Sequence, residues 1–367
     1  MRRLQLPDFP WDSLAADKAL AARHPGGIVD LSVGTPVDPV PAVVRDALAG
    51  PAADVPGYPT THGTPELREA IAGSLARRFH VSVDPRDVLP TIGSKELVAW
   101  LPTLLGVTAG DLVVIPEIAY PTYEVGALLA GAEFARTDGL TVLGPRRPAL
   151  IWLNSPSNPT GRVLPVEHLR KVVAWARERG AIVASDECYL ALSAPPHRGT
   201  SILHPDVSDG DHTGLLAVHS MSKSSSLAGY RAGFVTGDPA LVKRLLEIRK
   251  HAGMLMPAPV QAAMTAALGD DAHAEEQRAR YATRRERLRA ALAAAGWATE
   301  HSEAGLYLWV ARPGLDCWGS MQLLAEAGIL VAPGEFYGPA GREHVRVALT
   351  ATDERIDAAV ARLAAIA

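Results

Sequence analysis

The sequence predicts an α/β fold in which a mainly parallel sheet is covered by helices on both faces. Short runs of consecutive apolar residues, such as 149–153 and 215–218, alternate along the chain with longer segments of helical character. Strands buried on both faces lack the apolar–polar alternation of half-exposed strands, and helical crossovers join parallel neighbours. Ligands bind beyond the carboxyl ends of such strands, and polar residues follow several of these runs.

Composition narrows the class of protein. The 367 residues are 48% hydrophobic and 21% charged, which is typical of a soluble globular protein with two domains that share a core. A net charge of −4 provides no basic surface for nucleic acid. Two cysteines are too few for a disulfide framework or a metal site, and we find neither a signal peptide nor a membrane-spanning run. We therefore expect a cytoplasmic protein.

The N-terminal third begins with an irregular arm, 1–27, that contains a short helix at 13–22. A strand is expected at 28–33 and a helix at 41–49. Thr64 can cap the next helix, 65–80, because a proline follows it in the first helical position. From there strands and helices alternate, with strands expected at 88–92, 112–115, 149–153, 181–184, 215–218 and 233–236.

The C-terminal third reads as a second unit. A helical region, 239–269, is interrupted at Pro257 and Pro259 and connects the two parts. An amphipathic helix at 281–295 ends at Gly296, where glycine favours helix termination. Strands at 306–310 and 345–349 and a closing helix at 354–366 complete the unit.

The chemistry is concentrated in the loop after the strand 215–218. Lys223 lies there among serines, where an amine can be desolvated and lose its proton, as a Schiff-base lysine requires. Arg231 follows between Gly229 and Gly233, and an arginine fork with nearby hydroxyls suits a phosphate dianion. A Schiff-base lysine with a phosphate clamp indicates pyridoxal phosphate. A serine-rich loop with one lysine is, taken alone, more often a solvated turn.

Polar residues at the other strand ends have plausible positions around one pyridoxal ring. Asp186 is the candidate partner of the pyridine nitrogen, and Tyr189 and Asn158 are candidates for the ring oxygen. Tyr120 could stack on the ring, and the turn before the helix that starts near Ser94 could offer backbone N–H groups to the phosphate. Individually, these residues could equally be caps, turns or core aromatics. The histidines show no metal-ligand spacing, so no metal is expected.

Three motifs together resemble those of fold-type I pyridoxal-phosphate enzymes of the class I and II aminotransferase family. They are Asn158-Pro159-Thr160-Gly161, Asp186-Glu187-Cys188-Tyr189, and Ser220-Met221-Ser222-Lys223 with Arg231. The resemblance extends over nearly the whole chain, from the segment 31–36 to Arg346. It implies a seven-stranded sheet in a large cofactor-binding domain, 41–260, and a smaller α+β domain, 261–367, to which the arm 1–40 contributes.

The resemblance also implies roles for individual residues. Lys223 would carry the cofactor and shuttle the substrate proton, with Asp186 on the pyridinium and Tyr189 and Asn158 on the ring oxygen. Arg346 would grip the substrate carboxylate, with backbone from Gly34. The phosphate would be held by Ser94, Lys95, Ser220, Ser222 and Arg231, and by Tyr58 from a neighbouring subunit, which makes the active unit a homodimer.

The substrate is less well defined by the sequence. Segments 6–12, 37–41 and 349–353 resemble actinobacterial succinyldiaminopimelate aminotransferases of lysine and diaminopimelate biosynthesis, with a keto acid, 2-oxoglutarate, as acceptor. That donor has further carboxylates on a long arm, and Lys95 is the candidate cation for them. Its alternative is a solvated first-turn lysine.

Other functions share some of these features. An aminotransferase for aspartate, glutamate or alanine would differ only in the distal pocket, and a β-lyase would share the fold and the lysine. A transcription regulator would need a DNA-binding domain, and only 27 residues precede the first expected strand. A nicotinamide dehydrogenase is disfavoured because no Gly-x-Gly occurs in the chain.

Overall fold

The computed structural model describes residues 6–366, and its larger part is built on a seven-stranded sheet. Strand β8 runs antiparallel to both of its neighbours and the other pairs are parallel, so the expected mainly parallel α/β fold is confirmed. The strands lie in the order β2 (Val88–Ile92), β8 (Ala232–Gly237), β7 (Leu215–Ser220), β6 (Ile182–Asp186), β5 (Leu150–Asn154), β3 (Leu112–Ile115) and β4 (Glu133–Arg136).

Helices cover both faces of this sheet, because successive side chains of a strand point to opposite faces. In β5, Leu150 and Trp152 belong to one hydrophobic core, and Ile151 and Leu153 belong to the other. The first core is covered by α4 (Gly93–Leu104), α5 (Thr122–Ala130) and α8 (Pro239–Ala252). The second is covered by α2 (Ala42–Ala49), α3 (Pro65–Phe79), α6 (Val166–Arg179) and α9 (Ala258–Gly269).

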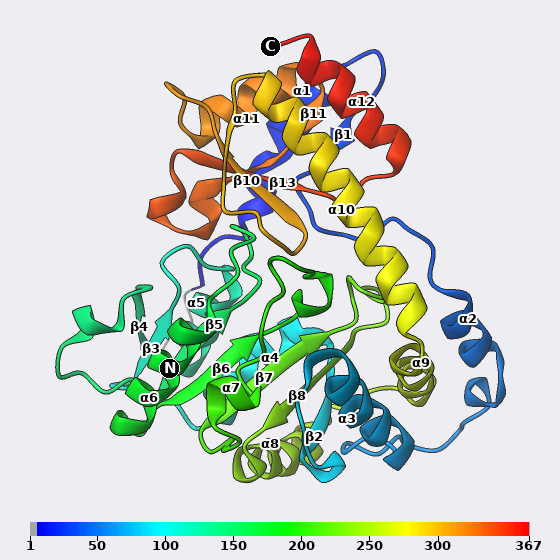
Figure 1. Cartoon of the computed structure of the whole chain (residues 1–367), viewed down its shortest axis with the longest axis vertical. Helices are drawn as coiled ribbons and strands as arrows, with labels where there is room; N and C mark the ends of the chain where they lie inside the picture. Colours follow the sequence, from blue (N-terminus) through cyan, green and yellow to red (C-terminus); the bar gives the residue numbers. More distant parts are fainter. Residues whose placement is uncertain (1–5, 367) are drawn as a thin grey trace.

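The smaller part combines N-terminal and C-terminal segments, which Figure 1 shows side by side at the top. Its four-stranded antiparallel sheet has the order β12 (Ala332–Pro333), β13 (His344–Ala348), β10 (Tyr307–Ala311) and β9 (Ala298–Glu300). A parallel pair joins β1 (Val29–Asp30) to β11 (Ile329–Leu330). The helices are α1 (Ala15–Ala21), α10 (Asp271–Ala294), α11 (Cys317–Glu326) and α12 (Asp353–Ala364).

Short helices connect several of these elements. One is α7 (Pro205–Ser208), and the others are the 3₁₀ helices η1 (Pro10–Leu14), η2 (Pro51–Ala53), η3 (Pro85–Asp87), η4 (Leu140–Leu143), η5 (Leu190–Leu192), η6 (Gly334–Tyr337) and η7 (Pro339–Gly341). No helix within residues 6–366 has the combined length and apolar character needed to cross a membrane.

Local signals placed most element ends correctly. The cap expected at α3 is present, since the Thr64 hydroxyl accepts a hydrogen bond from the Leu67 N–H at 3.2 Å. The strand expected at 28–33 is only two residues long, and β4, β9 and α11 were not anticipated. The helix expected at 281–295 begins ten residues earlier, at Asp271. The prediction missed these first turns because they are polar and lack an apolar stripe.

The division between the two domains stays a prediction. The expected boundary at 260/261 falls inside α9, whose residues Val260, Met264 and Leu268 pack in the core beneath the large sheet. The junction between α9 and α10, at Asp270, therefore fits the packing better than the boundary given by the sequence. From this junction α10 runs into the smaller part, as Figure 1 shows.

A buried ion pair fixes the middle of α10. The guanidinium of Arg284 donates to both carboxylate oxygens of Asp38, at 2.7 and 2.8 Å, and its Nε donates to Asp353 at 2.8 Å. The Arg284 side chain is 2% exposed and that of Asp38 is 9% exposed. Burial alone would raise the pKa of Asp38, but the bonds from Arg284 and Gln277 hold it below its ordinary value.

We expect Arg284→Ala to lower the free energy of unfolding by about 3–5 kcal/mol, because it leaves the Asp38 carboxylate buried and unpaired. Arg289→Ala on the same helix removes an exposed pair with Glu286 and should cost less than about 1 kcal/mol. Urea denaturation of both variants measures the difference. An equal decrease in the free energy of unfolding for both variants would show that the buried pair stabilises the fold no more than the exposed pair.

Candidate active site

A cavity of about 680 Å³ lies at the carboxyl ends of the large sheet, where it meets the smaller part. Asp186 ends β6 and Ser220 ends β7, so the sheet itself delivers these two side chains to the cavity. Every site residue expected from the sequence except Tyr58 lines this cavity, namely Gly34, Ser94, Lys95, Tyr120, Asn158, Asp186, Tyr189, Ser220, Ser222, Lys223, Arg231 and Arg346.

Lys223 lies mostly buried in the loop that connects β7 to β8. Its ammonium group donates a hydrogen bond to the carbonyl of Gly34, which comes from the N-terminal segment. Burial, with smaller contributions from the positive charges of Arg346 and Arg231, lowers the pKa of Lys223 to about 8. The amine is thus far easier to deprotonate than an exposed lysine, as a nucleophile or a general base requires.

Asp186 provides a buried carboxylate on the floor of the cavity. Its Oδ2 accepts from the Tyr123 hydroxyl at 2.9 Å, and its Oδ1 accepts from the Cys188 N–H at 3.2 Å. Burial raises the pKa of Asp186, while the bonds from Cys188 and Tyr123 oppose the increase. A buried carboxylate is stabilised strongly by a neighbouring cation, and a protonated ring nitrogen is a cation of suitable size.

Arg346 and Asn158 are joined across the two parts of the molecule. Arg346, from β13, donates to the Asn158 side-chain oxygen at 2.9 Å and to the Ser32 carbonyl at 2.6 Å. The face of the guanidinium lies 4.0 Å from the centre of the Tyr307 ring, and its buried Nε has no hydrogen-bond partner among the described residues. A planar fork held this way can recognise a carboxylate by two parallel bonds.

An anion cradle lies at the start of α4. No side chain caps this helix, so its first N–H groups remain available at its N-terminus. Gly93 has a φ of +72°, and a Cβ there would meet the Arg231 guanidinium at 2.2 Å. A Cβ on Gly233 would lie 3.0 Å from the Ser94 nitrogen, so both glycines allow a close approach. The Ser220 hydroxyl donates to Ser222 at 2.9 Å beside them.

The mouth of the cavity is more apolar than its floor. Phe9 and Trp11 of the N-terminal arm stand there with ring centres 5.6 Å apart. The Lys95 ammonium lies 5.4 Å from the centre of the Phe9 ring, and it has no hydrogen bond or ion pair with a described residue. Burial and the neighbouring Arg231 lower the pKa of Lys95. Tyr120 faces the same space, and burial raises its pKa to about 12.

Tyr58 does not reach this cavity. Its side chain is 97% exposed on the chain and is absent from the cavity lining. The role expected for it across a subunit boundary stays a prediction.

Some residues of the site were not recognised from the sequence. Tyr123 bonds Asp186, and the Asn154 side chain both donates to the Asp186 carbonyl at 2.8 Å and accepts from the Asn158 N–H at 2.7 Å. The Tyr307 hydroxyl lies 3.2 Å from that of Tyr189. Asn154 ends β5, and Tyr123 opens a helix after β3, so the strand-end argument extends to both. Tyr307 comes from a distant strand and carries no such signal.

Comparison with known proteins decides the family. The model of "Aminotransferase class I and II" matches residues 27–363. This chain belongs to the class I and II aminotransferases. The chain is 65% identical over 361 residues to the probable aminotransferase Rv1178 of Mycobacterium tuberculosis, a match that covers 98% of this chain and 85% of that protein. It is 59% identical over 359 residues to 4-dedimethylamino-4-oxo-anhydrotetracycline transaminase OxyQ of Streptomyces rimosus, covering 98% and 99%.

Solved structures of aminotransferases share the fold. One from Neisseria meningitidis has a TM-score of 0.90 at 31% identity, covering 100% of this chain and 99% of that one. A probable N-succinyldiaminopimelate aminotransferase from Thermus thermophilus has a TM-score of 0.87 at 28% identity, covering 98% and 100%. The aminotransferases of this family use pyridoxal phosphate, which is the cofactor of this chain.

The residues present fit that cofactor. The uncapped start of α4, with Arg231 and the close glycines, suits the phosphate, and Asp186 suits the ring nitrogen. Lys223 lines the same cavity, in the loop that also carries Arg231. The phosphate, the nitrogen and the aldehyde each have a partner of matching chemistry in one cavity.

We expect the cofactor-free protein to react at Lys223 with an amine-acylating reagent in a pH-dependent way. Only the neutral amine is nucleophilic, so labelling should rise with pH and level off above about 8, the pKa set by burial. Mass spectrometry of tryptic peptides measures the labelling, with the exposed Lys171 as internal reference. A reaction at Lys223 that keeps rising in parallel with Lys171 would contradict the lowered pKa.

We also expect Asp186→Ala to weaken pyridoxal phosphate binding, because the ring nitrogen loses its counter-ion. Loss of a buried charge pair corresponds to about a hundredfold change in Kd. Titration of the cofactor-free protein, followed by absorbance, measures the affinity. An unchanged Kd would remove Asp186 from this role.

Proposed function

We propose that this aminotransferase transfers the amino group of N-succinyl-LL-2,6-diaminopimelate to 2-oxoglutarate, a step of lysine and diaminopimelate biosynthesis. The observation that carries the choice of donor is Lys95, a cation at the cavity mouth that no acidic side chain of the described residues neutralises. A donor with a carboxylate at the end of a long arm would supply the missing charge. The similar structure from Thermus thermophilus bears the name of this activity.

In this proposal the chain binds one carboxylate at each end of the cavity. Arg346 takes the α-carboxylate, since its guanidinium is fixed by Asn158, Ser32 and the Tyr307 face. Lys95 takes the distal carboxylate. The two cations thereby fix the length and the direction of the bound substrate, which places its α-proton in reach of one base.

The proton transfer is assigned to Lys223. Pyridoxal phosphate supplies an electron sink for the charge that develops at the substrate α-carbon. Lys223 removes the α-proton as a general base, which its lowered pKa allows near neutral pH. Asp186 keeps the ring nitrogen charged, while Tyr189 and Asn158 bond the ring oxygen and Ser94, Ser220, Ser222 and Arg231 hold the phosphate.

The active unit is proposed to be a homodimer in the cytoplasm. Tyr58 is almost fully exposed on a single chain, so it is free to reach the phosphate of a second copy. The aminotransferase of this proposal needs only an amino donor and a keto-acid acceptor besides its own copy.

A second candidate substrate is a keto group on a bulky ring system. It is favoured by the apolar mouth, where Leu6, Phe9 and Trp11 stand, and by the 59% identity to the transaminase named for an anhydrotetracycline ketone. In that case Lys95 would lie against ring oxygens rather than a carboxylate. Common donors such as aspartate, glutamate or alanine remain the third possibility.

We expect the visible absorbance of the cofactor-loaded enzyme to bleach with succinyldiaminopimelate and barely with aspartate or alanine, each added without acceptor. Lys95→Met should raise the KM for succinyldiaminopimelate about tenfold, which corresponds to about 1.4 kcal/mol, because the distal carboxylate loses its proposed, partly desolvated cation. Stopped-flow absorbance measures both effects. Lys223→Ala is the negative control and should not bleach with any donor.

Each alternative function predicts a distinct result when the donors and acceptors are added to the cofactor-loaded enzyme. Bleaching by a common amino acid would retain the chemistry but reject this donor. Release of pyruvate without an acceptor would indicate a β-lyase. Recovery of the absorbance only with a polycyclic ketone would favour the second candidate.

A further inference from the structure

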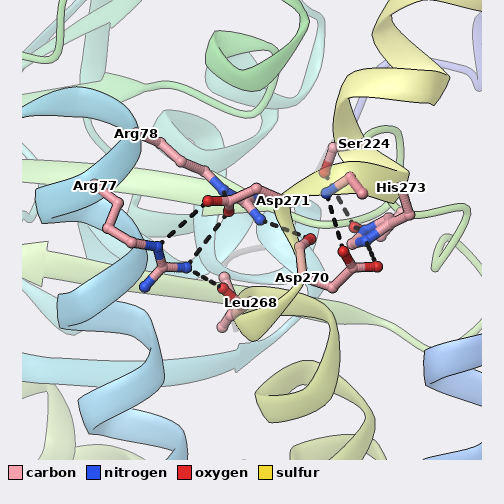
Figure 2. Close-up of polar contacts among 9 residues, drawn as sticks. Arg77, Arg78, Ser224, Leu268, Asp270, Asp271 and His273 are labelled. Atoms are coloured by element: carbon pink, nitrogen blue, oxygen red, sulfur yellow. Dashed lines mark hydrogen bonds and ion pairs between the residues drawn. The ribbon is translucent and has the colours of Figure 1, made fainter.

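The junction of α9 and α10 is pinned to α3 by two neighbouring arginines, as Figure 2 shows. Arg78 donates from Nε to an Asp271 oxygen at 2.5 Å and from NH2 to the Asp270 carbonyl at 3.1 Å. Arg77 donates to the Leu268 carbonyl at 2.7 Å and to Asp271 at 3.3 Å. The first turn of α10 is therefore held against α3, and one further side chain projects from this turn toward the lysine loop.

That side chain is His273, which connects the junction to the lysine loop. Its Nδ1 lies 3.1 Å from Asp270 Oδ2, and its Nε2 lies 2.8 Å from the hydroxyl of Ser225. The imidazole is 8% exposed, and Ser225 is 1% exposed. A chain of two hydrogen bonds thus runs from Asp270 to a serine two residues after Lys223.

The order of carboxylate, imidazole and hydroxyl is that of a hydrolytic triad, but the burial excludes such a role. A nucleophilic serine needs room for a substrate carbonyl, and neither Ser225 nor His273 lines the cavity described above or either of two smaller ones. The hydrogen bonds from Asp270 through His273 to Ser225 must therefore act through the loop to which Ser225 belongs.

Ser225 belongs to a tightly wound loop. Its N–H donates to the Met221 carbonyl at 3.1 Å, and the next residue, Ser226, has a φ of +53°. Such a left-handed conformation is unfavourable for a residue with a side chain, so surrounding contacts must maintain it. The bond from His273 holds the loop at a residue that does not line the cavity, whereas Lys223 and Arg231 of the same loop do.

The same helix also supports the other side of Lys223. One turn after His273, the Gln277 side chain donates to Asp38 at 2.8 Å. Asp38 follows closely on Gly34, whose carbonyl accepts the hydrogen bond from Lys223. Thus α10 contacts both segments between which the amine is held.

We propose that His273 is a positioning residue, which with Asp270 and Ser225 fixes the loop that presents Lys223 and Arg231 to the cavity. The inference rests on the role proposed for Lys223 in proton transfer, but its structural part does not depend on that role. Without the imidazole, the buried Ser225 hydroxyl keeps, among the described residues, only a long contact of 3.4 Å with the Ser224 hydroxyl, and the loop can relax by shifting Lys223. A displacement of about 1 Å at a reacting group is sufficient to slow a reaction strongly.

The test compares His273→Ala, Ser225→Ala and the double variant with His273→Gln, whose amide can still reach the Ser225 hydroxyl. Glu276→Ala is the matched control, since this exposed residue of α10 pairs only with Arg280. The first readout is hydrogen–deuterium exchange of residues 221–231 in the cofactor-free protein. The second is kcat and KM for the amino donor that the enzyme accepts.

We expect about tenfold faster exchange in this loop for both alanine variants. We also expect about a tenfold lower kcat, with KM changed by less than about twofold. The double variant should be no worse than either single one, because all remove the same contact. His273→Gln and Glu276→Ala should resemble the wild type in both readouts.

Two results would overturn the proposal. One is loop exchange that stays at the wild-type rate in both Ser225→Ala and His273→Ala. The other is a loss of kcat in His273→Gln as large as in His273→Ala, which would mean that the contact with Ser225 is irrelevant.

Faster exchange with unchanged kcat would reject the catalytic effect of positioning. Inactivity of the wild-type enzyme with every donor would instead reject the proposed function, because the exchange measurement needs no substrate.

Discussion

Burial of the Lys223 amine is the constraint on which the site depends. An ammonium group removed from water loses hydration, and it remains in place only if the surrounding chain holds it and offers an acceptor. The Gly34 carbonyl is that acceptor, and the loop between β7 and β8 supplies the support. The same burial lowers the pKa of Lys223 to about 8. Loss of hydration thus both destabilises the charged amine and makes it easier to deprotonate.

The two parts of the molecule share this site through a small number of buried polar contacts. Arg346 reaches from the smaller part to Asn158 of the larger one, and α10 reaches the lysine loop of the larger part through His273 and Ser225. Because these contacts are buried, they tolerate little variation in geometry. The position of Arg346 relative to Lys223 therefore depends on these buried contacts.

The cavity separates shared chemistry from substrate choice. Its floor carries Asp186, Lys223 and the anion cradle, which match a cofactor common to the whole family. Its mouth carries the arm with Phe9 and Trp11, beside Lys95. Phe9 is 54% exposed and its side chain carries no polar group, so it can shape the opening without taking part in the chemistry of the floor.

The sequence by itself determined the fold class, the alternation of elements and most of the cavity lining. These features are local: buried strands are continuous apolar runs, and residues at parallel strand ends meet at one edge. Asp186 and Lys223 were recognised for this reason. Tyr307 and His273 were not, because each joins the site across a long separation in the chain, from β10 and α10. The first turns of α10 have a local helix cap at Asp270 and Glu–Arg pairs one turn apart, but no apolar stripe. Only the tertiary contacts with Arg77, Arg78 and Ser225 reveal what this segment supports. Pairings of this kind depend on the packing of whole elements, which no local pattern encodes.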